Sequence, residues 1–249
     1  MSHELKNPWF HRSRPIDEPR ARLFCFPYAG GSATLYHLWP NGVPDNVEVV
    51  AVALPGRTYR LFEQAFTRMA PLLAALEREL VLLLDRPYSF FGHSMGALLA
   101  YELIHRLQAN GHRQPLHLFV SGRPAPQCTA TKTRIHELPL EEFIETLRNY
   151  YGTPEIIFRN PDLQDLVLAA LQADLELLET WNYAPHERLT LPISAYGGES
   201  DRGVPREHLE AWREQSTGPF EMHFLPGDHF FLHSAQADLL NLLSRKLLA

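Results

Sequence analysis

Short runs of consecutive apolar residues alternate along the chain with longer segments in which apolar residues recur every three or four positions. The short runs predict buried strands of a parallel sheet, because a strand that is covered on both faces shows no polar alternation. The longer segments predict crossover helices that flank that sheet. The expected strands cover residues 23–26, 49–53, 88–91, 116–120, 193–196 and 220–224.

Helices are expected on both sides of these strands. Apolar residues between positions 69 and 83 recur with helical spacing, and Pro87 prevents that helix from continuing. A second helix follows Ser94 and stops at Gly111. Near the end of the chain, Ser234 is placed to cap a last helix. The apolar face of this last helix carries Leu239, Leu242, Leu243 and Leu247.

One segment, from about residue 138 to 183, interrupts the alternation of strands and helices. It contains two helical stretches on either side of a break at Gly152-Thr153-Pro154, and the second begins with Asn160 as N-cap and Pro161 at the first helical position. A helix pair packed on the sheet would explain the pattern, but insertions near active sites are often lids over a substrate chamber, and we favour a lid. We expect one α/β domain over residues 1–249, with a core over about 15–137 and 184–249 and a helical lid over about 138–183.

Composition and charge exclude several classes of protein. The 249 residues are 45% hydrophobic and 21% charged, as in a globular domain. The formal charge of -6 and the lack of a Lys/Arg-rich run argue against nucleic-acid binding. No stretch approaches the roughly 18 uncharged apolar residues that cross a bilayer, and the opening residues are too polar for a signal sequence. We expect a cytoplasmic monomer that does not associate with membranes.

The two cysteines, Cys25 and Cys128, are too few for a disulfide framework and lack the spacing of a zinc site. We expect both to be buried thiols.

The strongest chemical signal is Gly92-His93-Ser94-Met95-Gly96, which lies between an expected strand and an expected helix. This is the pattern of a nucleophile elbow, in which a sharp turn holds a serine in strained geometry. The chain must reverse within a few residues, so the flanking positions leave no room for side chains. Ser94 is therefore the expected nucleophile.

A serine hydroxyl needs a general base, and in this architecture the acid and the histidine follow the serine in that order. Asp201 comes just after the strand at 193–196 and is the expected acid. His229 follows the strand at 220–224 and is the expected base.

Competing residues lie close to both positions. Asp228 adjoins His229, Glu199 shares the acid loop, and His233 follows His229 at a spacing that a metal pair could use. Each is the weaker choice, because neighbouring loop residues usually point apart and the two histidines have no evident third ligand. His93 and His223 are expected to be ordinary packed or exposed histidines. We assign neither a metal nor a cofactor.

Acyl transfer also requires hydrogen-bond donors for the developing oxyanion. The backbone amide of Met95 supplies the first. The second is expected from the loop at residues 27–31, where paired glycines let the backbone approach the nucleophile, with the amide of Ala29 preferred over that of Tyr28. This loop lacks the spacing of a phosphate-binding loop, since no Gly-Lys-Ser/Thr follows.

Taken together, the motifs resemble those of the type II thioesterases, free-standing α/β-hydrolases that serve nonribosomal peptide and polyketide synthetases. The resemblance spans most of the chain. It is carried by residues 26–33 (FPYAGGSA), 54–57 (LPGR), 88–97 (YSFFGHSMGA), 152–154 (GTP) and 173–174 (AD). One departure is Arg202, where family members more often have a small or apolar residue.

The resemblance implies an α/β-hydrolase fold with a mostly parallel sheet, flanking helices and a helical lid. It also implies hydrolysis of unwanted acyl groups from the phosphopantetheine arm of acyl or peptidyl carrier proteins. The family roles carry over to Ser94, Asp201 and His229 as triad and to the Ala29 and Met95 amides as oxyanion hole. The phosphopantetheine belongs to the substrate, so the enzyme itself needs no cofactor.

Because carrier proteins are commonly acidic and this chain is net negative, docking is expected to use a local basic or apolar patch. The candidate residues are Arg57, Arg60, Arg123 and Arg202. A small-molecule carboxylesterase and an acyltransferase or cyclising thioesterase stay open as alternatives, since one triad serves all of these reactions. A catalytically silent acyl- or partner-binding protein is disfavoured by the intact triad.

Overall fold

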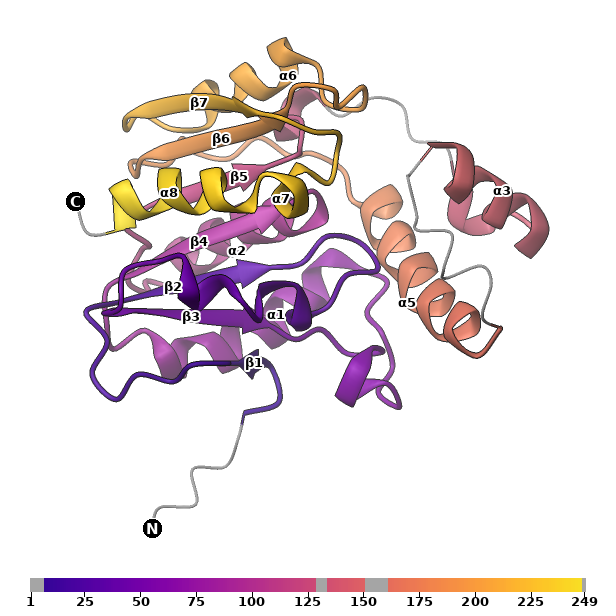
Figure 1. The fold of residues 1–249 in the computed structure, drawn as a ribbon, viewed down its shortest axis with the longest axis horizontal. Helices are drawn as coiled ribbons and strands as arrows, with labels where there is room; N and C mark the ends of the chain where they lie inside the picture. Colours follow the sequence, from indigo (N-terminus) through magenta and orange to yellow (C-terminus); the bar gives the residue numbers. More distant parts are fainter. Residues whose placement is uncertain (1–6, 129–133, 151–160, 248–249) are drawn as a thin grey trace.

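A computed structural model describes residues 7–128, 134–150 and 161–247. Within these residues a seven-stranded sheet has the order β1-β3-β2-β4-β5-β6-β7 (Figure 1). The strands are β1 (Phe10–His11), β2 (Ala21–Phe26), β3 (Val47–Val52), β4 (Tyr88–His93), β5 (Leu118–Ser121), β6 (Ile193–Gly198) and β7 (Phe220–Leu225). All neighbouring strands are parallel except β1, which pairs antiparallel with β3.

The predicted strands are confirmed as β2 to β7, with ends that shift by one or two residues. The short edge strand β1 was not predicted, because two residues carry too little pattern to indicate a strand. The mostly parallel sheet with helices on both faces confirms the expected α/β-hydrolase fold.

Alternate residues of the central strands face opposite sides of the sheet and join two separate apolar cores. On one side Phe24, Phe90 and Val120 pack against α1 (Met69–Leu80) and α2 (Met95–Ala109). On the other side Phe91 and Phe119 pack against α7 (Phe231–Ser234) and α8 (Gln236–Leu247). The sheet is thus covered on both faces, which accounts for the continuous apolar runs in its strands. The short α6 (Arg206–Glu210) lies between β6 and β7 in the chain.

Two details of the sequence prediction are wrong. Ser234 does not cap the last helix, because it is the final residue of α7, and α8 begins two residues later. Cys25 is buried as expected, but Cys128, the last residue of a 3-10 turn (Pro126–Cys128), is only half-buried.

The insertion forms two helices, α3 (Leu140–Tyr150) and α5 (Pro161–Thr180), as its pattern predicts. Pro161 is the first residue of α5, whereas Asn160 and the break at residues 152–154 lie outside the described residues. Figure 1 shows both helices standing to one side of the sheet instead of lying on a face. They share a small apolar cluster formed by Ile135, Phe143, Leu147, Leu168, Leu171 and Leu175.

The last turn of α5 joins the insertion to the main core. Leu177 on α5 and Trp181, which directly follows this helix, belong to the core on the α1/α2 side of the sheet. The insertion therefore has its own apolar centre but is anchored to the body of the protein at one end of α5. No helix in the described part of the chain combines the length and apolar character needed to cross a membrane.

Candidate active site

Ser94 lies between the last residue of β4 and the first residue of α2. Its backbone has φ 52 and ψ -111, and Thr58 is the other non-glycine residue with positive φ among those described. Such geometry costs about 1–3 kcal/mol and persists only where surrounding structure holds it. Here the Ser94 amide donates to the Ser121 carbonyl at 2.7 Å, and the Ser94 carbonyl accepts from the Ala97 amide at 3.1 Å. The strained turn expected of a nucleophile elbow is present.

The two glycines of the elbow are required by close backbone contacts. A Cβ on Gly92 would lie 2.2 Å from the backbone carbon of Gly96. A Cβ on Gly96 would lie 2.1 Å from the Phe26 carbonyl oxygen, at the end of β2. The elbow therefore packs directly against the start of the loop at residues 27–31.

Asp201 and His229 come together from loops that follow β6 and β7. Nδ1 of His229 donates to Oδ2 of Asp201 at 2.7 Å, and the Asp201 side chain is 3% exposed. The other carboxylate oxygen of Asp201 accepts from the Gly203 amide at 2.9 Å. With both oxygens engaged, the carboxylate is fixed against the ring, and Nε2 of His229 is left as the nitrogen available to act on a substrate or a hydroxyl.

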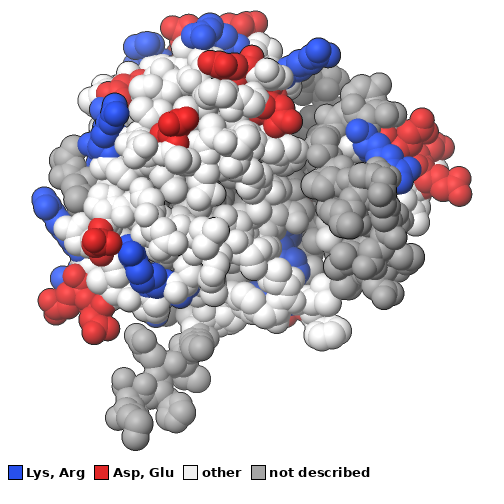
Figure 2. Space-filling view, viewed as in Figure 1, with Lys and Arg blue, Asp and Glu red and all other residues white. Residues whose placement is uncertain are grey.

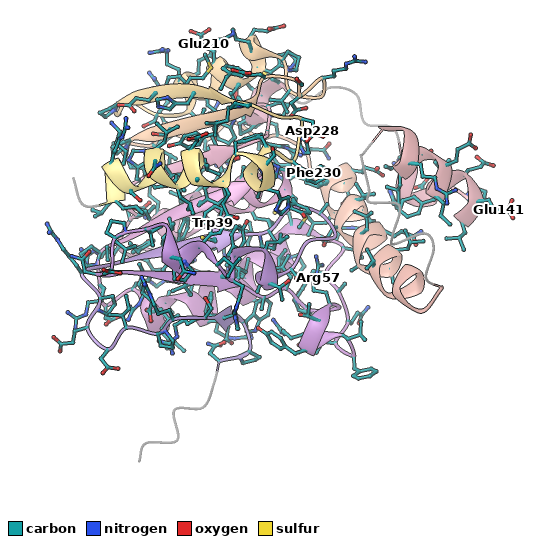
Figure 3. All side chains as sticks on the ribbon, viewed as in Figure 1. Trp39, Arg57, Glu141, Glu210, Asp228 and Phe230 are labelled. Atoms are coloured by element: carbon teal, nitrogen blue, oxygen red, sulfur yellow. The ribbon has the colours of Figure 1, made fainter. Side chains whose placement is uncertain are left out.

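The competing residues make other contacts. Asp228 is exposed and accepts from the Phe230 amide at 2.8 Å, so it closes its own turn (Figure 3). Glu199 is exposed. His233 lies 3.2 Å from the Tyr28 hydroxyl through Nε2, and burial lowers its pKa. His223 faces Glu221 at 3.5 Å on β7.

His93, which sequence reasoning set aside as an ordinary packed histidine, lies beside the expected base. Its ring centroid is 5.1 Å from that of His229, and its Nδ1 hydrogen-bonds the Ser121 hydroxyl at 2.9 Å. Burial lowers the pKa of His93 well below its usual range, and the neighbouring His229 and His233 lower it further. A Cβ on Gly122 would lie 2.6 Å from the His93 ring, so the pocket for this ring is tightly closed. His93 is thus a buried, neutral ring that lies beside the ring of His229.

The loop at residues 27–31 lies between the elbow and α5. Its Gly31 amide donates to the Tyr28 carbonyl at 2.9 Å, and its Gly30 amide donates to Oδ2 of Asp174 at 2.8 Å. Since those two amides are occupied inside the protein, Ala29 and Tyr28 are the positions in this loop that can direct an amide at a ligand. Ala29 is half-buried and packs against both the main core and the insertion cluster.

Met95 occupies the first position of α2 directly after Ser94 and is fully buried. The first four amides of a helix have no acceptor within the helix, so the Met95 amide has no helical partner. The positive end of the helix dipole favours an anion at this point.

Two of the arginines expected on a docking patch are instead buried. Arg57 forms a bidentate pair with Asp174, with Nη1–Oδ2 at 2.6 Å and Nη2–Oδ1 at 2.8 Å. Arg60 donates to the Ala53 carbonyl at 2.7 Å, pairs with Glu63, and lies over the Trp9 ring. The prediction of these two as docking residues is wrong, because each is held by internal partners that sequence spacing did not reveal.

The remaining two candidates for the patch differ in exposure. Arg202 is exposed and Arg123 is half-buried. On the face drawn in Figure 2 the charged side chains of the described residues gather toward the margins, and much of the centre is uncharged.

Comparison with known proteins places this chain in a family. A thioesterase domain model matches residues 21–247. The gramicidin S biosynthesis protein GrsT of Aneurinibacillus migulanus is 38% identical over 241 residues, which cover 97% of this chain and 94% of that protein. Thioesterase PikA5 of Streptomyces venezuelae is 33% identical over 96% of this chain and 85% of its own length.

Solved structures give the same result. The type II thioesterase BorB from the borrelidin biosynthetic cluster superposes with a TM-score of 0.88 at 35% identity, covering 97% of this chain and 98% of its own. ClbQ from the colibactin NRPS/PKS pathway superposes with a TM-score of 0.86 at 30% identity, covering 91% and 96%.

The chain therefore belongs to the thioesterase family, whose members of this α/β-hydrolase fold are serine hydrolases that act on thioesters. Its resemblance to the type II thioesterases, expected from the motifs, is confirmed by these relatives.

Proposed function

We propose that this enzyme hydrolyses acyl groups from the phosphopantetheine arm of acyl or peptidyl carrier proteins, and so unblocks a nonribosomal peptide or polyketide synthetase. The names of the relatives support this pathway class, since they include a gramicidin S biosynthesis protein and thioesterases from the borrelidin and colibactin clusters. The observation that carries the chemistry is the 2.7 Å hydrogen bond between Asp201 and His229 beside a strained serine elbow.

In this proposal His229 removes the proton from the Ser94 hydroxyl, and the resulting alkoxide attacks the thioester carbonyl. Asp201 holds the imidazole in the tautomer that leaves Nε2 free and stabilises the imidazolium that forms. The contact between His93 and His229 supports this assignment, because it brings the loop after β7 beside the end of β4, where Ser94 follows.

The tetrahedral oxyanion is stabilised by the amides of Met95 and Ala29. The position of Met95 at the start of α2 and the internal partners of Gly30 and Gly31 support this pair of donors. The carbon–sulfur bond then breaks, and the proton held by His229 passes to the departing sulfur, so that phosphopantetheine leaves as the thiol and His229 is neutral again. Because a thiol of this kind has a pKa of about 8.5, it departs with less protonation than an alkoxide needs. Water, activated by His229, hydrolyses the acyl-Ser94 intermediate and returns the free enzyme.

Incubation with acyl-loaded carrier proteins tests this proposal, with intact-mass measurement of the carrier, of the enzyme and of the released product. We expect the carrier to lose its acyl group, the product to be the free acid, and the Ser94→Ala variant to leave the carrier loaded. A cyclised or transferred product would indicate the acyltransferase or cyclising alternative. Faster turnover of simple esters than of carrier-bound thioesters would indicate a carboxylesterase.

A further inference from the structure

Asp174 is the point at which three separate elements of the molecule meet. It lies on α5, and its carboxylate accepts hydrogen bonds from Nη1 and Nη2 of Arg57 and from the Gly30 amide, at 2.6, 2.8 and 2.8 Å. The Arg57 and Asp174 side chains are 7% and 3% exposed. Figure 3 shows Arg57 between the sheet and α5. A bidentate, buried pair of this kind fixes the relative position of its elements.

The two halves of this ion pair hold adjacent residues of the loop at residues 27–31. Asp174 holds the Gly30 amide, and Nη1 of Arg57 donates to the Gly31 carbonyl at 3.0 Å. Leu171, one turn earlier on α5, packs on Gly30, where an added Cβ would lie 3.3 Å from its Cδ1. The peptide group fixed by Asp174 directly follows Ala29, whose own amide is the proposed oxyanion donor.

The backbone around Arg57 is bent to bring this side chain inward. Gly56 has φ 80, and Thr58, which is not a glycine, has φ 49. A strained residue at this position indicates that the surrounding contacts hold the loop in place. Arg57 also donates from Nε to the Pro55 carbonyl at 3.3 Å, so its guanidinium is oriented on both sides.

Attachment of α5 to the body of the protein does not by itself require Asp174. Two residues further along α5, Glu176 forms an ion pair with the exposed Arg68, and Leu177 and Trp181 enter the main core. The Glu176–Arg68 ion pair joins α5 to a residue outside the loop at residues 27–31. What distinguishes Asp174 is its bond to Gly30.

We propose that Asp174, oriented by Arg57, is a positioning residue that couples the insertion helix α5 to the oxyanion loop, so that the Ala29 amide is correctly aimed only while α5 is docked. This inference rests on the proposed function, because it assigns a role in the same reaction. It makes stabilisation of the oxyanion depend on the position of the insertion helix α5.

The test compares Asp174→Asn with Glu176→Gln, a matched change on the same helix that removes the Arg68 pair and leaves the oxyanion loop untouched. The substrate is a small N-acetylcysteamine thioester. Two inhibitors are compared. The Ser94 oxygen attacks the carbonyl of the first, a trifluoromethyl ketone, to give a tetrahedral oxyanion. The second is a thioether analogue of the same length, which has no carbonyl and forms no oxyanion.

For Asp174→Asn we expect kcat to fall by about tenfold to a hundredfold, near the lower end of what loss of an oxyanion donor costs, with KM little changed. Affinity for the ketone should fall in proportion to kcat, while affinity for the thioether stays the same. Glu176→Gln should match the wild type in kcat, in KM and in its affinity for each of the two inhibitors. Equal losses for ketone and thioether, or equal losses in both variants, would overturn the proposal in favour of a merely structural role.

A second variant is needed in case Asp174→Asn fails to fold. Removal of the Asp174 charge leaves the charge of Arg57 buried and unpaired, which destabilises the protein. The double variant Arg57→Met with Asp174→Leu removes both charges together, and it should keep α5 attached while still losing ketone affinity. A double variant with wild-type ketone affinity would contradict the proposal. Because the small thioester replaces the carrier, a wild-type enzyme that ignores carrier-bound substrates would refute the proposed function without affecting this test.

Discussion

The rings of His93 and His229 lie with their centroids 5.1 Å apart, and the interplanar angle is 59°. His93 is fully buried, and its pKa is held low by burial, so it stays neutral beside His229, the proposed base. Its pocket is closed by Gly122 and by the ring of Phe231. The base is thus oriented by Asp201 at one ring nitrogen and supported by an uncharged ring at its side.

Replacement of this neutral ring should disturb catalysis without touching the substrate. For His93→Ala we expect kcat to fall by about tenfold because His229 gains freedom, and the free energy of unfolding to fall by about 2–4 kcal/mol because a cavity opens. Steady-state kinetics and urea unfolding measure the two effects. His223→Ala, a half-buried histidine on β7, serves as the control and should change neither by much. Wild-type kcat in a His93→Ala variant that has lost stability would contradict the supporting role.

The proposed triad predicts a graded series of losses. Ser94→Ala and His229→Ala should each lower kcat by about a million-fold, and Asp201→Asn by about ten-thousand-fold, if precedents from serine proteases transfer. Asp228→Asn is the matched control, because it changes the adjacent carboxylate, which closes its own turn. Activity measured on an acyl thioester should be nearly unchanged in that control. A larger loss in Asp228→Asn than in Asp201→Asn would reverse the assignment of the acid.

Because the backbone of Ser94 is strained, we expect a variant that relieves the strain to gain stability and lose activity. Glycine adopts positive φ without the steric cost that a Cβ imposes, so Ser94→Gly should raise the free energy of unfolding by about 1 kcal/mol while activity is lost. Ser94→Ala keeps the Cβ and should show no such gain. Urea unfolding of the three proteins gives the comparison, and equal midpoints for the glycine and alanine variants would show that the strain is absent.

The sequence predicted those features that depend on local residue types. The elbow at residues 92–96 and the six parallel strands follow from short patterns, and the structure contains them. The Arg57 prediction failed because the partner of Arg57 is Asp174, 117 residues away, and burial of an arginine depends on such a partner. The Ser234 cap failed because a short helix, α7, intervenes after His229. The position of His93 beside His229 likewise depends on the packing of distant strands.

Two buried histidines outside the active site predict an acid-sensitive fold. Burial, helped by His186, lowers the pKa of His105 to about 4, and burial, helped by Lys246, lowers the pKa of His117 to about 4. In the unfolded chain both titrate near the ordinary value of about 6.5. Between these values the unfolded state binds more protons, so the stability that is present above about pH 6.5 is lost as the pH falls toward 4. Each group contributes at most about 3 kcal/mol to this loss.

A single substitution separates this effect from the titration of carboxylates over the same range. His105 stacks on His186 at 4.1 Å, and its Nε2 is buried without a hydrogen-bond partner among the described groups, so His105→Phe preserves the ring and removes only the titration. We expect the variant to lose less stability than the wild type between pH 6.5 and 4, by up to about 3 kcal/mol, in urea unfolding at a series of pH values. Glu102, whose pKa burial raises, is present in both proteins, so its contribution largely cancels in the comparison. Parallel stability curves for the two proteins would contradict the prediction, because they would show that His105 binds protons equally in the folded and unfolded states.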